Sequence, residues 1–135
     1  MASPNSSASP GLQNLSANQA VRLLAYAKAI SANAVADTIM PLIDTSKYSV
    51  LYVIVTNASA SLAQAHGGMF TLPAGAGTAI VSDAALSGAS GSTIVVQHTV
   101  ASTAVETGQS LYYRVGTVNT AAATFDVYVY GFDFS

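Results

Sequence analysis

The chain has 135 residues, of which 51% are hydrophobic and only 7% are charged, and its net charge is −2. This length suits one domain with its own core, and the composition is the opposite of a disordered chain. The absence of cysteine excludes disulfides and thiolate metal sites, and four basic residues cannot neutralise a phosphate backbone, so we expect no nucleic-acid partner.

Two segments precede the region of short strands. Residues 1–16 are rich in Ser, Pro and Asn without a charged side chain, which predicts a flexible N-terminal arm and not a secretory signal. Residues 17–36 are expected to form either a helix, near 17–30, or an extended arm. The helix is favoured because one helical face would collect Ala20, Leu23, Leu24, Ala27 and Ile30.

Residues 37–135 are expected to form one all-β domain, because β-branched and aromatic runs alternate with turn residues. The expected strands are 38–43, 48–56, 67–72, 78–81, 92–100, 110–118 and 124–132. Pro41 cannot donate a ladder hydrogen bond, so the first of them is an edge strand or contains a bulge. We predict a single-domain antiparallel β-sandwich or jelly roll of seven to eight strands.

The last strand is apolar or aromatic on both faces. One face carries Phe125, Val127, Val129 and Gly131, and the other carries Asp126, Tyr128, Tyr130 and Phe132. Since a sheet face open to water should be polar, the tyrosines indicate contact with another chain. The residues expected at such contacts are Tyr112, Tyr128, Tyr130, Phe132, Leu23, Leu24 and Ile30.

The residues that could carry catalysis are few. His66 precedes two glycines, as in the oxyanion loop of esterases, but the matching Gly-x-Ser-x-Gly elbow is missing. His98 alternates with valines in its strand, which favours a packed histidine over a metal ligand. We therefore expect no enzyme activity, no cofactor and no metal site. The apolar stretch Ala20–Ile43 is broken by charged residues and Pro41, so no membrane partner is expected either.

Several blocks of the sequence carry a resemblance to a known group of proteins. They are residues 36–43 (ADTIMPLI), 48–59 (YSVLYVIVTNAS), 77–81 (GTAIV), 111–116 (LYYRVG) and 121–131 (AAATFDVYVYG). Over residues 35–132 the chain resembles small virion proteins of tailed bacteriophages, and most closely the capsid decoration, or cement, proteins. The resemblance implies a β-sandwich or jelly roll that is made in the host cytoplasm, forms a homotrimer and binds the major capsid protein on the outer capsid surface.

A different function remains open from the residues. A tail or fibre module that binds a host-surface glycan would use exposed aromatics beside polar loop residues, and Tyr, Asn and Ser could supply them. The absence of tryptophan and of clustered acidic residues for calcium counts against it.

Overall fold

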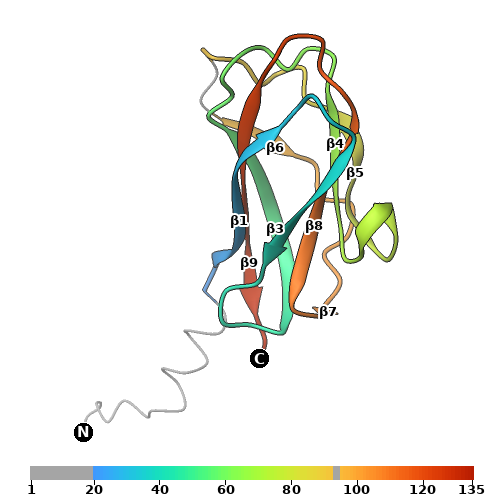
Figure 1. Cartoon of the computed structure of the whole chain (residues 1–135). Helices are drawn as coiled ribbons and strands as arrows, with labels where there is room; N and C mark the ends of the chain where they lie inside the picture. Colours follow the sequence, from blue (N-terminus) through green and yellow to red (C-terminus); the bar gives the residue numbers. More distant parts are fainter. Residues whose placement is uncertain (1–19, 93–94) are drawn as a thin grey trace, which may run out of the picture.

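The computed structural model describes residues 20–92 and 95–135 (Figure 1). These residues form an all-β structure, without a helix that could cross a membrane. The strands are β1 (Arg22–Ser31), β2 (Ala36–Pro41), β3 (Lys47–Thr56), β4 (His66–Phe70), β5 (Ala79–Ala85), β6 (Val95–His98), β7 (Glu106–Thr107), β8 (Ser110–Thr117) and β9 (Thr124–Asp133); the 3-10 turn η1 (Pro73–Gly75) follows β4.

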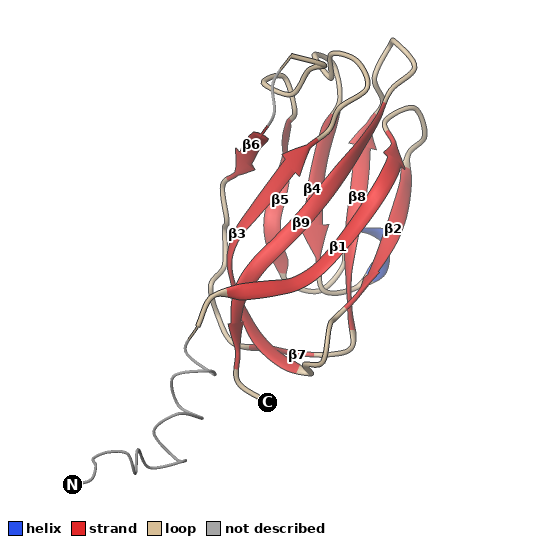
Figure 2. Cartoon of the chain, turned by 90° about the vertical axis from the view of Figure 1, so that its left-hand side faces the viewer, coloured by secondary structure: helices blue, strands red, loops and turns tan. Residues whose placement is uncertain are grey.

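The strands form two antiparallel sheets that pack face to face (Figure 2). One sheet has the order β1-β9-β3-β6, with the short β7 also paired to β3, and the other has the order β2-β8-β4-β5. Each early strand pairs with its counterpart counted from the end of the chain: β1 with β9, β2 with β8, β3 with β6 and β4 with β5. With β7 left aside, this is the eight-strand order of a jelly roll, so the predicted fold class is confirmed.

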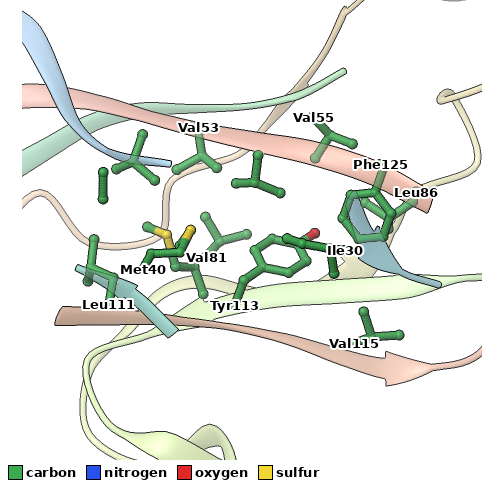
Figure 3. Close-up of a cluster of buried hydrophobic side chains, with 14 of the residues drawn as sticks. Ile30, Met40, Val53, Val55, Val81, Leu86, Leu111, Tyr113, Val115 and Phe125 are labelled. Carbon is green, nitrogen blue, oxygen red and sulfur yellow. The ribbon is translucent and has the colours of Figure 1, made fainter. Parts of the chain in front are cut away.

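The core lies between the two sheets (Figure 3). Val53, Val55 and Phe125 enter it from one sheet, and the alternate residues of β8 enter it from the other. Each fully buried side chain of this kind contributes about 1.5–3 kcal/mol relative to leaving it in water. The alternation noted in the last strand therefore has its cause in this layer.

The helix predicted near residues 17–30 is wrong over residues 22–31, which form strand β1; residues 1–19, including the predicted arm, lie outside the described residues. β1 pairs with β9, and its register shifts between Leu23 and Ala25 and again between Ala27 and Ile30. Each bulge inserts residues that break the two-residue period. The inward residues then recur at spacings of three, which is also the spacing of a helical face.

The second bulge of β1 is held by a carboxylate from the neighbouring strand. Ala29 has a positive φ of 56°, and its backbone N–H donates to Oδ1 of Asp126 at 2.8 Å. The other oxygen of Asp126 accepts a hydrogen bond from the side-chain amide of Asn57 at 3.1 Å, just beyond the end of β3. One buried acidic residue thus joins β1, β9 and the end of β3.

The other predicted strands are found with small shifts of their ends. β2 runs over 36–41 and is an edge strand, as Pro41 indicated. The sequence did not predict β7, because two residues carry no periodic signal.

A substitution in β9 tests how closely the first sheet is packed. A Cβ at Gly131 would overlap the carbonyl oxygen of Ser49 and lie 3.0 Å from the backbone nitrogen of Leu51. Gly131→Ala should therefore lower the free energy of unfolding by about 1–3 kcal/mol in urea denaturation. Gly91→Ala is the control, because its Cβ would meet only ordinary contacts at 3.9 Å. Equal stabilities of the two variants would contradict this packing.

Candidate functional site

The outward side of the β1-β9-β3 sheet carries two rows of large uncharged side chains. Cross-strand partners in these rows lie directly opposite one another, and along β3 and β9 they alternate with buried core residues. We call this surface the tyrosine face; its rows are Leu23–Tyr130–Tyr52 and Tyr26–Tyr128–Ile54.

The tyrosines of this face stack in pairs. The ring centroids of Tyr52 and Tyr130 are 5.1 Å apart, and those of Tyr26 and Tyr128 are 6.2 Å apart. Tyr26 is 46% exposed, and the other five residues are partly exposed. Tyrosine combines a large apolar ring with a hydroxyl that can stay in water, which is why it is enriched in protein interfaces.

The charged residues at the two ends of β9 are bound within the chain. Asp126 is used by the bulge of β1, as described above. At the other end Asp133 accepts hydrogen bonds from Ser135, Thr45 and Arg22, and these contacts, those from Ser135 foremost, hold the pKa of its carboxyl well below the usual range. The nearest exposed cation along β1 is Lys28, in the bulge. A partner would therefore meet uncharged side chains along both rows, with the exposed Lys28 two residues beyond Tyr26 on β1.

The structure separates the residues predicted at chain contacts into three places. Leu23, Tyr128 and Tyr130 belong to the tyrosine face, and Phe132 follows them along β9. Tyr112 lies on the outward side of the opposite sheet, across from Ile39 of β2. A correction applies to Leu24 and Ile30, which are 0% and 4% exposed core residues and offer no surface to a partner.

Three members of the tyrosine face were not among the predicted contact residues. Tyr26 was missed because its segment was assigned to a helix, where it lay off the apolar face. Tyr52 and Ile54 could have been found from alternation, since they share one face of β3 opposite the buried Val53 and Val55.

The outward side of the other sheet has a different chemistry. Arg114 forms an ion pair with Asp37 at 3.1 Å, and His66 lies 3.5 Å from Asp83. Asp37 also accepts the backbone N–H of Ala74 at 2.7 Å, which ties η1 to this sheet. Charged groups therefore interrupt the outward surface of this sheet, whereas the two rows of the tyrosine face contain only uncharged side chains.

A buried polar pair joins the two sheets. Nε2 of His98 in β6 lies 2.8 Å from the hydroxyl of Tyr113 in β8, and a Cβ at Gly67 would overlap that hydroxyl. Burial lowers the pKa of His98 to about 4, against the opposing effect of Asp83, and burial raises the pKa of Tyr113. Both groups are therefore neutral at pH 7, as suits a hydrogen bond inside a core.

Groups able to bind a metal ion are also dispersed. Within residues 20–92 and 95–135 no three His, Asp or Glu side chains come together as a metal site would require. Neither His66 nor His98 has been brought into a cluster with more than one acidic residue. We therefore take the tyrosine face, whose six side chains are all large and uncharged, as the candidate functional site.

No protein-family model matches the chain, and neither does any curated protein or solved structure that was compared with it. The site is defined by its geometry alone. The resemblance of residues 35–132 to phage virion proteins stays a prediction from the sequence.

The His98–Tyr113 pair predicts a pH dependence of stability. Below its ordinary pKa of 6.5, His98 takes up a proton in the unfolded chain, whereas the folded chain resists protonation down to about pH 4. Stability is therefore full near neutral pH and is lost as the pH falls through this window, by about 2 kcal/mol at about pH 4.5.

The measurement is urea denaturation at pH 7 and pH 4.5 for the native chain and for His98→Gln, which cannot take up this proton. The variant should lose about 2 kcal/mol less than the native chain between the two pH values. Parallel losses in both proteins would show that His98 does not titrate as its burial requires.

Proposed function

We propose that this protein is a head decoration, or cement, protein of a tailed bacteriophage. It binds the outer capsid surface as a homo-oligomer and stabilises contacts between major capsid subunits. The observation that carries the proposal is the tyrosine face, a continuous uncharged surface on a chain with few charges elsewhere. Exposed apolar surface of this kind marks interaction sites.

The physical mechanism is burial of surface across a seam. Apolar area removed from water contributes about 25 cal/mol per Å², from which the cost of ordering side chains is subtracted. That cost is small on the tyrosine face, because the rings already pack against each other in pairs on adjacent strands. A rigid face that spans two capsid subunits opposes their separation under pressure from packaged DNA.

The fold supports the proposal without deciding it. Jelly rolls occur in viral capsid proteins and also in lectins, and a fold alone does not fix a function. A glycan-binding tail or fibre module therefore remains the competing function. A sugar site places groups that hydrogen-bond to hydroxyls beside its aromatic rings. In the tyrosine face the residues beside the rings include the apolar Leu23 and Ile54.

A binding experiment with matched variants tests the function. The full chain is added to capsids of its own phage assembled without it, and bound protein is measured by co-sedimentation. Tyr128→Ser should weaken binding by about thirtyfold or more, in the range of an interface hot spot, which is about 2 kcal/mol or more. Tyr112→Ser, on the opposite sheet, should bind as the native chain does.

Thermal unfolding of each variant shows that it is folded before binding is compared. Equal binding by the two variants, or no capsid binding together with specific signals on a glycan array, would count against the decoration function.

A further inference from the structure

Among residues 20–92 and 95–135, no strand pairs with one edge of β3 along part of its length. On this edge β7 pairs with residues 47–48 of β3, and β6 pairs with residues 53–56. Residues 49–52, between these two pairings, bind to neither strand. The connecting segment turns away from β3 here, since the N–H of Ala101 donates to the carbonyl of Ile80 in the other sheet at 2.7 Å.

A hollow of about 420 Å³ lies at this gap; we call it the β3 hollow, and its lining residues are Leu51, Gln97, His98, Thr99, Val100 and Thr103. Its volume falls in the range of about 300–1,000 Å³ that is usual for binding sites. Leu51, the extra residue of the bulge in β3, is 41% exposed beside it. The hydroxyl of Ser49 donates to the carbonyl of Thr103 at 2.6 Å, so the connecting segment returns to β3 by residue 103.

The lining of the β3 hollow selects for an uncharged occupant. It combines apolar side chains with amide and hydroxyl groups, and His98 is neutral at pH 7. An unpaired strand edge beside such a hollow suits an extended polypeptide, because an extended chain can supply both backbone partners and side chains.

We propose that the β3 hollow binds the N-terminal segment, residues 1–19, of a second copy of this chain in an extended conformation. The chemistry matches: this segment has no charged side chain and places Leu12 and Leu15 among Ser, Asn and Gln. Its length is also sufficient, since 19 extended residues span up to about 60 Å.

The position of β1 sets the geometry of a contact with a second copy. The segment leads into β1, at one edge of the sheet, whereas the β3 hollow lies at the opposite edge beyond β9. A segment that leaves one edge and binds the opposite edge of the next copy makes a head-to-tail contact, which closes into a ring when the rotation allows.

The segment also leaves the sandwich at the end where β3 begins, and the unpaired stretch of β3 starts at residue 49. Arg22, at the start of β1, binds Asp133 at 3.2 Å, and the next residue, Phe134, donates its N–H to the carbonyl of Lys47, where β3 begins, at 2.8 Å. Figure 1 shows the start of β1 and the C-terminus at this end.

Disulfide trapping tests the contact directly, because the native chain has no cysteine. Full chains carrying only Leu15→Cys are mixed with full chains carrying only Gln97→Cys, one of them mass-tagged, and oxidised. In the control mixture, chains carrying the exposed Thr120→Cys replace those carrying Gln97→Cys. We expect the yield of mixed disulfide dimers with Gln97→Cys to be ten times or more the yield with Thr120→Cys. Equal yields with both partners would overturn the proposal.

A doubly substituted chain, Leu15→Cys with Gln97→Cys, separates the two sources of the segment. Disulfide-linked oligomers support a second copy, whereas a bond closed within one chain overturns the proposal by showing that the segment binds its own hollow.

A charge placed at the hollow gives an independent test. Leu51→Arg should weaken self-association at least tenfold in analytical ultracentrifugation, while Leu72→Arg, a 52% exposed control outside the β3 hollow, should leave it unchanged. Unchanged self-association of the folded Leu51 variant would overturn the proposal. These experiments contain no capsids, so their failure and that of the decoration function can be told apart.

Discussion

The pairing of β9 with β1 on one side and β3 on the other is the interaction on which most of the structure depends. Inward, β9 supplies Phe125, Val127 and Val129 to the core. Outward, the same strand supplies Tyr128 and Tyr130, around which the tyrosine face is built. Gly131 lets the backbones approach closely where β3 bulges. A change that displaced β9 would disturb the core and the candidate contact surface together.

Several of the few charged residues form ion pairs or hydrogen bonds within the folded chain. Both arginines form ion pairs, Arg22 with Asp133 and Arg114 with Asp37. Asp126 holds the bulge of β1 and the end of β3. With these groups engaged, the chain has little charge left to keep copies apart in solution. An uncharged face and an uncharged edge hollow are consistent with surfaces that are covered in an assembly, one by the capsid and the other by a neighbouring copy.

The sequence predicted those parts of the fold in which side chains alternate regularly. β8 and most of β9 follow a two-residue period, so the two faces of β9 could be assigned from the sequence. β1 could not be recognised, because two bulges moved Leu24 and Ile30 into the core at helix-like spacing. Bulges depend on partners distant in sequence, here Asp126, which lies 97 residues from Ala29. The site was predicted in part for the same reason: Tyr128 and Tyr130 followed from alternation, whereas Tyr26 required the register of β1.

The contact between the tyrosine face and the capsid is tested most directly by measuring the solvent access of individual tyrosines in capsid-bound protein. Chemical footprinting of tyrosine rings, read by mass spectrometry, compares the free protein with protein bound to capsids. If the tyrosine face lies against the capsid, Tyr26 and Tyr128 should be strongly protected on binding, with no change at Tyr112 on the opposite sheet. Protection of Tyr112 with Tyr26 and Tyr128 left accessible would contradict it, because the capsid would then lie against the sheet that carries the ion pairs.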